Sequence, residues 1–186
     1  VDGLVLGGGM ANTFLLAKGK PIGASLAEPD MVDTARRIMD VAAAYNCQIL
    51  LPKDVVVAVE FKLGAAHRLA SSDDVADGEM ILDAGAESVA AATAFLDRCS
   101  TIVWNGPMGA FEIPPFDAAT TALACAVAAK TQRDGLMSVA GGGDTMAALA
   151  NAGVNDQFSY VSTAGGAFLE WLEGKRLPGV EALRID

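Results

Sequence analysis

The sequence predicts an α/β fold, a three-layer α/β/α arrangement with a mainly parallel sheet. Short apolar runs of strand length alternate with alanine-rich segments of helical character through most of the 186 residues. The strand-like runs are continuously apolar rather than alternating, as expected for strands covered by helices on both faces. With 52% hydrophobic residues, a chain of this length can form one domain with a substantial core.

The first half of the chain begins with an apolar run at 4–6, predicted to be a strand, and a helix over 10–17. A second helix begins at Pro29, since proline is favoured in the first helical turn, and apolar residues three or four apart follow it. Continuous apolar runs at 48–51 and 55–59 predict two strands buried on both faces.

The second half repeats strand and helix in turn. It follows a polar stretch, 60–78, which we expect to be an irregular excursion outside the main sheet. Gly135 and Gly174 are expected to end two of the helices. The expected elements are strands over 80–83, 101–104, 136–140 and 158–161, and helices over 87–98, 116–130, 146–150 and 165–173.

Charge and cysteine content exclude several classes of function. A net charge of -10 and an isoelectric point near 4.4 argue against a surface for nucleic acid or anionic membrane, because both need clustered Lys and Arg. Cys47, Cys99 and Cys125 are far apart and lack metal-ligand spacing, so we expect a reducing, cytoplasmic location and no zinc site. No apolar run reaches the roughly 18 residues of a membrane span, and no leader pattern is present. Because the chain opens directly into a strand pattern, we expect it to be a piece of a longer protein.

A run of three glycines, Gly141 to Gly143, lies between a predicted strand and a predicted helix and is followed by Asp144 and Thr145. Glycines without side chains let several amides converge on one anion at a helix start, and phosphate suits such a place. Asp144 would repel bare phosphate, so a Mg²⁺-nucleotide is the ligand that fits best. The alternative is ordinary loop and N-cap chemistry. Similar turns recur at 7–9 and 163–166.

The loop from Asn105 to Glu112 follows another predicted strand and combines an amide, turn residues, apolar groups and one carboxylate. It is suited to form the edge of a nucleoside site, with apolar walls for a base and Glu112 for ribose hydroxyls, although a purely structural turn is the alternative. Lys53 is interpreted as a surface loop charge. His67, the sole histidine, lacks a recognisable orienting partner and is not assigned a catalytic role.

Right-handed crossovers bring the carboxyl ends of parallel strands to one edge of the sheet. Ligands of open α/β sheets bind at that edge, so one cleft can hold base, ribose, phosphates and metal.

These motifs resemble the C-terminal, nucleotide-binding domain of the phosphoglycerate kinase family, and the resemblance covers essentially the whole chain. The string Trp-Asn-Gly-Pro-Met-Gly at 104–109 and the string Gly-Gly-Gly-Asp-Thr at 141–145 are together highly specific for it. Further matching segments are Gly-Gly-Gly-Met-Ala at 7–11, Val-Ser-Thr at 161–163 with Gly-Ala at 166–167, and the ending at 172–180. The implied fold is Rossmann-like, and 1–186 is expected to be that domain, incomplete at its N-terminus.

The resemblance also implies an activity, transfer of a phosphoryl group between 1,3-bisphosphoglycerate and ADP in glycolysis, with Mg²⁺ as cofactor and ADP or ATP as co-substrate. Adenine would lie against Gly8, Gly9, Leu26, Leu82, Pro107 and Ala110. Asn105 would approach the phosphates and Glu112 the ribose. The β- and γ-phosphates and Mg²⁺ would meet Gly142, Gly143, Asp144 and Thr145, with Asp144 as metal ligand. Thr163, Gly165 and Gly166 would face the transferred group, and the catalytic assignments are Gly143, Gly165 and Gly166.

The chain departs from the family pattern at Ala164 and Ala86, where glycine and proline are usual. By the resemblance, the domain that holds 3-phosphoglycerate and an upstream Gly-Gly-Ala-Lys segment would precede Val1, so the chain alone is expected to be inactive. A monomer is expected. A non-catalytic module that only binds nucleotide, or a fragment that binds nothing, is the serious alternative. A dinucleotide-dependent dehydrogenase is a weaker rival, because Asn12 stands where its fingerprint needs a third glycine.

Overall fold

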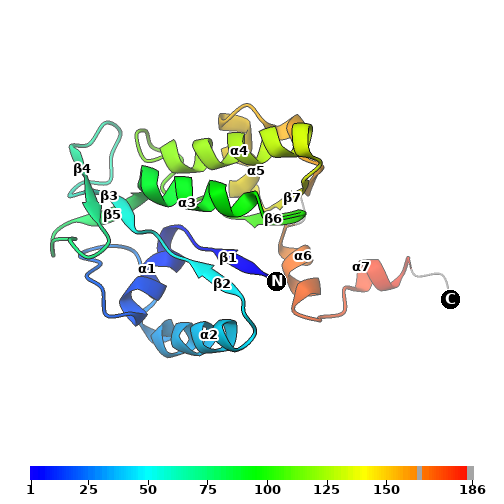
Figure 1. The fold of residues 1–186 in the computed structure, drawn as a ribbon, viewed down its shortest axis with the longest axis horizontal. Helices are drawn as coiled ribbons and strands as arrows, with labels where there is room; N and C mark the ends of the chain where they lie inside the picture. Colours follow the sequence, from blue (N-terminus) through cyan, green and yellow to red (C-terminus); the bar gives the residue numbers. More distant parts are fainter. Residues whose placement is uncertain (163–164, 184–186) are drawn as a thin grey trace.

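The computed structural model describes residues 1–162 and 165–183 and has helices on both sides of short parallel sheets (Figure 1). The first half contains β1 (Gly3–Val5), α1 (Gly8–Ala17), the 3-10 turn η1 (Pro29–Met31), α2 (Val32–Ala44), β2 (Gln48–Leu50), β3 (Asp54–Ala58), β4 (His67–Ser71), β5 (Met80–Ala84) and α3 (Ala86–Leu96). The second half contains β6 (Thr101–Asn105), α4 (Ala118–Asp134), β7 (Met137–Gly141), α5 (Gly143–Asn151), η2 (Asn155–Gln157), β8 (Tyr160–Ser162), α6 (Gly165–Leu172) and α7 (Pro178–Glu181).

The parallel strands form two groups. β1 pairs with β2, and β6, β7 and β8 pair in that order, each time in parallel. In Figure 1, α1 and α2 lie on one side of the strands, and α3 and α4 lie together on the other. The predicted α/β class with a mainly parallel arrangement is confirmed.

The excursion is a separate antiparallel sheet, in which β3 pairs with β4 on one side and β5 on the other. The expectation that 60–78 is irregular is wrong, because β4 lies within it. The runs at 55–59 and 80–83 are strands, but they belong to this antiparallel sheet. In β3, Val55 and Val57 on one face are 0% and 1% exposed, and Ala58 on the other face is 2% exposed. Burial of this kind does not distinguish parallel from antiparallel pairing.

Helix boundaries differ from the predictions by at most four residues, and helix ends are the least certain part of such predictions. α1 and α5 begin at glycines, Gly8 and Gly143, within the glycine turns. Pro29 begins a 3-10 turn that leads into α2. Gly135 ends α4 with φ 72°, the left-handed conformation that favours glycine. A core cluster on α3, α4, α5, β6 and β7, including Trp104, Leu123 and Leu149, supports the edge of the sheet described below.

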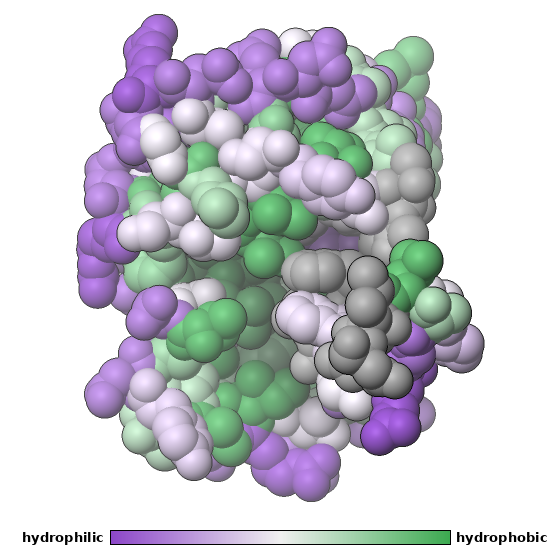
Figure 2. All heavy atoms as spheres, turned by 90° about the vertical axis from the view of Figure 1, so that its right-hand side faces the viewer, coloured by the Kyte–Doolittle hydropathy of each residue, from purple (hydrophilic) through white to green (hydrophobic). Residues whose placement is uncertain are grey.

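The side of the molecule nearest the N-terminus and α6 is apolar around a hollow (Figure 2). A groove of about 610 Å³ lies between α2 and the β1–β2 pair, and Leu4, Ile38, Val41 and Tyr45 are among its lining residues. Apolar faces of this kind are typical of surfaces that contact other polypeptide. In the described part of the chain, no helix has both the length and the hydropathy needed to cross a membrane.

Candidate functional site

The loop 106–112 between β6 and α4 is central to the candidate site, because several other segments hold its backbone. The Gly106 amide donates to the Thr145 hydroxyl of α5 at 2.7 Å, and the Met108 amide donates to the Thr120 hydroxyl of α4 at 3.0 Å. Buried amides without such partners would carry a desolvation penalty. The two hydroxyls therefore tie the loop to the starts of two helices.

The same loop is tied to the first glycine turn and to β5. The Gly8 amide donates to the Met108 carbonyl at 2.9 Å, and the Ala110 amide donates to the Leu82 carbonyl at 2.7 Å. A Cβ atom on Gly7 would lie 2.7 Å from the Cα of Met108, so the turn approaches the loop as closely as glycine allows.

Three of the predicted ligand loops begin side by side at the carboxyl ends of β6, β7 and β8. Asn105, Gly141 and Ser162 are register partners across these strands. Gly142 has φ 101°, and a Cβ atom there would lie 2.9 Å from Oδ1 of Asn105. Position 142 therefore requires glycine for two reasons, its backbone conformation and the close approach of the Asn105 side-chain amide.

Asp144 is in the first turn of α5, exposed, and without an ion-pair or hydrogen-bond partner among the described residues. The N-cap of α5 is Gly142, and no side chain caps this helix, so Asp144 is not the cap. The described residues hold no group of three His, Cys, Asp or Glu side chains able to bind a metal. Asp144 is therefore suited to be a single protein ligand of a cation whose other ligands are phosphate and water oxygens.

Thr145, also predicted to contact phosphate, has a side chain only 1% exposed. Its hydroxyl accepts the Gly106 amide, so it serves the loop rather than an open ligand position. This hydrogen bond joins residues 39 apart in sequence, so no local sequence pattern predicts it.

The predicted adenine contacts of the first glycine turn lie together. A Cβ atom on Gly9 would be 3.3 Å from Cδ2 of Leu26, and one on Gly8 would be 3.9 Å from the Pro107 carbonyl oxygen. Asn12 donates from Nδ2 to the Leu26 carbonyl at 3.0 Å and so fixes that segment to α1. The Leu26 side chain is 80% exposed, which leaves it free to cover a ligand.

Leu82 and Ala110 complete this apolar side. Both pack at the edge of a small cluster around the fully buried Phe116. Glu112 follows in the same loop and is exposed. Thr163 and Ala164 lie outside the described residues, and Gly165 and Gly166 begin α6 directly after β8 and that gap.

Beneath the loop lies a carboxylate that sequence reasoning missed. Asp83, 1% exposed, accepts the Ala119 amide at 2.8 Å and the Ala84 amide at 2.9 Å. Burial raises the pKa of Asp83 to about 7, the two amides oppose the rise, and the nearby charge of Asp117 adds to it. The signal that could have found it is a carboxylate ending an apolar strand run.

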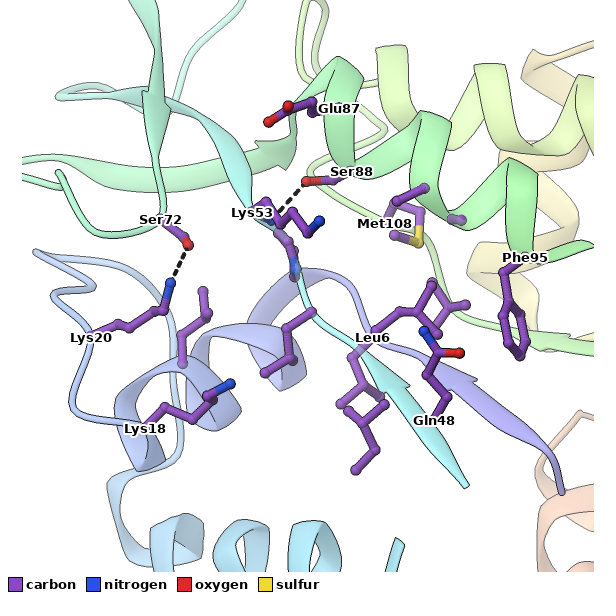
Figure 3. A pocket seen from close by; sticks show the side chains of 18 of the residues that line it. Leu6, Lys18, Lys20, Gln48, Lys53, Ser72, Glu87, Ser88, Phe95 and Met108 are labelled. Atoms are coloured by element: carbon purple, nitrogen blue, oxygen red, sulfur yellow. Dashed lines mark hydrogen bonds between the residues drawn. The ribbon is translucent and has the colours of Figure 1, made fainter. Parts of the chain in front are cut away.

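A cavity of about 800 Å³ lies elsewhere, between α3 and the β1–β2 pair (Figure 3). None of the predicted nucleotide contacts lines it. Its rim carries Lys18, Lys20 and Lys53, and Lys20 is already bonded to Ser72 at 2.8 Å and Asp73 at 2.9 Å. Lys53 is exposed in the turn between β2 and β3, as the sequence predicts for a surface loop charge.

His67 lies on β4, where its ring serves structure. Nδ1 is 3.0 Å from the Ala65 carbonyl oxygen, and the ring meets the edge of Phe116 with centroids 5.9 Å apart. These contacts give His67 a structural role in the antiparallel sheet.

Fold and site together define an α/β protein whose glycine-rich loops gather at the carboxyl ends of parallel strands. A family model described as phosphoglycerate kinase matches residues 1–175, so the chain belongs to the phosphoglycerate kinase family. Phosphoglycerate kinases of Xanthobacter autotrophicus and Rhodospirillum centenum are 64% and 63% identical over 184 and 183 residues, or 99% and 98% of this chain, and 46% of either relative is covered. The chain thus spans less than half the length of these relatives.

Two solved structures of phosphoglycerate kinases share the fold of this chain. Phosphoglycerate kinase from Coxiella burnetii superimposes with a TM-score of 0.92 at 48% identity, over 97% of this chain and 46% of that one. The enzyme from Pyrococcus horikoshii gives a TM-score of 0.80 at 28% identity, over 98% of this chain and 45% of that one.

Proposed function

We propose that this chain is the ADP/ATP-binding part of a phosphoglycerate kinase and that it binds a Mg²⁺-nucleotide at the carboxyl ends of its parallel strands. The observation that carries the proposal is the row of Asn105, Gly141 and Ser162, from which three of the predicted ligand loops begin, with the exposed Asp144 in the first turn of α5. Open α/β sheets bind their ligands at this edge.

The nucleoside end is assigned to Gly8, Gly9, Leu26, Leu82, Pro107 and Ala110, with Glu112 toward the ribose. This assignment is supported by the hydrogen bonds that hold the loop 106–112 against the first glycine turn and β5. The exposed Leu26 provides one apolar wall.

The phosphate end is assigned to Asn105 and to the starts of α5 and α6, where amides and helix dipoles favour an anion. Gly142 and Gly143 offer amides without side chains, and Gly165 and Gly166 do the same at the start of α6. Thr163 is assigned to the same end of the nucleotide. We assign Thr145 an indirect part, through its bond to Gly106.

Mg²⁺ bound by Asp144 would neutralise phosphate charge, and the chain's own residues would position the nucleotide. Phosphoryl transfer needs positioning and charge neutralisation rather than a protein nucleophile, which suits a site of glycine turns and one carboxylate. The acceptor, 3-phosphoglycerate, would be held by another part of the enzyme, so this chain alone should not phosphorylate it. A cytoplasmic location and a monomeric state belong to the same proposal.

Calorimetric titration of ADP with and without Mg²⁺ tests the site, and NADH serves as the competing ligand class. We expect Mg²⁺-dependent ADP binding and no NADH binding. Asp144→Asn should weaken Mg²⁺-ADP binding about tenfold or more, because it removes the charged metal ligand. Asp156→Asn, an exposed carboxylate on η2 outside the loops, is the matched control and should bind as the parent does. Equal binding by the parent and Asp144→Asn would exclude Asp144 as the metal ligand.

A non-catalytic nucleotide-binding module is the second candidate, because the same loops would serve it. Coupling the chain to the remainder of a phosphoglycerate kinase distinguishes the two. Turnover of ATP and 3-phosphoglycerate by the joined protein, and its absence in the chain alone, would support the enzyme.

A further inference from the structure

We propose that Asp83 is a positioning residue for the nucleoside end of the site, and that its buried carboxylate holds the loop 106–112 in its binding conformation. The inference rests on the function proposed above. Asp83 contacts no predicted ligand position itself; it acts through the loop.

Asp83 contacts the segment that contains the loop at two places, the start of α4 and the middle of the loop. At the far end it accepts the Ala119 amide in the first turn of α4 at 2.8 Å. The N-cap residue of α4, Asp117, makes no side-chain cap bond. Asp83, which lies on β5, therefore accepts an amide that the N-cap side chain would otherwise accept.

In the middle of the loop, Gly109 lies directly on Asp83. A Cβ atom on Gly109 would be 2.3 Å from Oδ1 of Asp83 and 2.6 Å from the Leu82 carbonyl oxygen. The next residue, Ala110, donates its amide to that same carbonyl. The loop is therefore seated on the end of β5, with the carboxylate between the strand and α4.

The charge of Asp83 matters because an ionised carboxylate accepts at both oxygens, whereas a protonated one carries a hydrogen on one of them. Protonation would remove one of its two amide partners or force the loop to shift. Asp83 accepts the amides of Ala84 and Ala119, pairs with Val56 of β3 and lies against Gly109. These neighbours are uncharged, and the charged group acting on Asp83 is Asp117. With its pKa raised to about 7 by burial, Asp83 changes state near neutral pH.

A merely structural cap would stabilise α4 without affecting the ligand. If Asp83 also positions the loop, the affinity for the nucleoside should fall as the pH falls through about 7. Adenosine is the suitable probe, because it has no phosphate and its own charge does not change between pH 6 and 8.5.

The experiment titrates adenosine into the chain by calorimetry from pH 6 to 8.5. We expect the parent to bind several-fold more weakly at pH 6 than at pH 8.5. Asp83→Asn, which keeps one acceptor, should bind weakly throughout with no pH dependence. Asp134→Asn, an exposed carboxylate at the far end of α4, is the control and should keep the affinity and pH profile of the parent. A parent affinity independent of pH would overturn the proposal, and this measurement needs no folded variant.

Amide hydrogen exchange separates this inference from the proposed function. In Asp83→Asn we expect about tenfold faster exchange at Met108, Ala110 and Ala119, with exchange in β6 and β7 unchanged. If the parent binds no adenosine and these amides still lose protection, the proposed function fails and the loop-holding role stands. Unchanged exchange at all three amides would overturn the loop-holding role whatever the binding result.

Discussion

Two buried carboxylates in this protein hold the starts of two neighbouring helices in the same way, yet they differ in ionisation. Asp54 begins β3 and reaches the first turn of α3; Asp83 lies on β5 and reaches the first turn of α4. Neither helix is capped by a side chain of its own N-cap residue. Both carboxylates also lie against a glycine, Gly85 or Gly109.

The difference lies in the number of donors. Asp54 accepts the Glu87 and Ser88 amides at 3.0 and 2.8 Å and the Ser88 hydroxyl at 2.5 Å. Burial pushes the pKa of Asp54 up, but these bonds outweigh it and hold the pKa below its ordinary value. Asp83 has two amide donors and is more deeply buried, so burial prevails and its pKa is raised to about 7. Burial alone therefore does not decide whether a carboxylate is charged; the donors around it do.

The largest expected difference between Asp83 and Asp54 is the way in which each contribution to the free energy of unfolding depends on pH. Asp83 has a folded pKa of about 7 and an ordinary value of 3.8, so its contribution to stability is full below about pH 4 and is lost as pH rises through 7. Between about pH 4 and 7, the contribution of Asp83 to the free energy of unfolding falls by about 4 kcal/mol, at about 1.4 kcal/mol for each pH unit. Asp54 behaves oppositely: its contribution is present above its ordinary pKa of 3.8 and is lost as pH falls through its lower folded value.

Urea unfolding followed by circular dichroism at several pH values measures both contributions. The free energy of unfolding of the parent minus that of Asp83→Asn should decrease from pH 4 to 8. The corresponding difference for Asp54→Asn should stay constant over that range and decrease only in more acidic solution. Two difference curves of the same slope would show that the carboxylates share one environment.

An intermediate effect concerns the two glycines. A Cβ atom on Gly109 would meet backbone, at 2.6 Å from the Leu82 carbonyl oxygen and 2.7 Å from Cα of Asp83, whereas one on Gly85 would meet only the Asp54 carboxylate, at 2.1 Å. A side chain shifts more easily than a backbone, so Gly109→Ala should cost about 3 kcal/mol and Gly85→Ala about 1–2 kcal/mol of unfolding free energy. The midpoints of urea unfolding at pH 7 test this order. A larger loss for Gly85→Ala would show that the loop, not the Asp54 cap, yields to the new methyl group.

The smallest effect concerns a hydroxyl in the first turn of each helix, which accepts backbone amides from the segment that packs against it. Thr120 accepts the Met108 amide at 3.0 Å, and Ser88 accepts the Lys53 and Asp54 amides at 2.9 and 3.2 Å. Thr120→Val keeps shape and leaves one buried amide unsatisfied, so it should cost about 1 kcal/mol. Thr121→Val, at the half-buried neighbouring position, is the matched control and should cost less. Comparable losses for the two valine variants would mean that helix propensity, not the Met108 bond, sets the cost.

The sequence was sufficient to predict the α/β class, most helices and strands, and the meeting of the loops after β6, β7 and β8. Those predictions rest on local patterns, glycine turns and apolar runs, together with the handedness of crossovers. The antiparallel pairing of β3 with β4 and β5 was beyond reach, because an apolar run reports burial and not strand direction. The roles of Asp83 and Thr145 were missed for another reason: their partners Ala119 and Gly106 are 36 and 39 residues away.

The row formed by Asn105, Gly141 and Ser162 also bears on the order in which the chain folds. Strands β3 and β4 are consecutive and need only a short connection to pair, whereas β6, β7 and β8 meet only after crossovers that contain α4 and α5. Closing longer loops costs more entropy, so the local hairpin should form early and the row late. During synthesis on the ribosome the row cannot close until Ser162 has emerged. The edge that we assign to the nucleotide is therefore among the last parts of this chain to be acquired, and a nascent chain stalled before β8 would carry a folded excursion without a binding site.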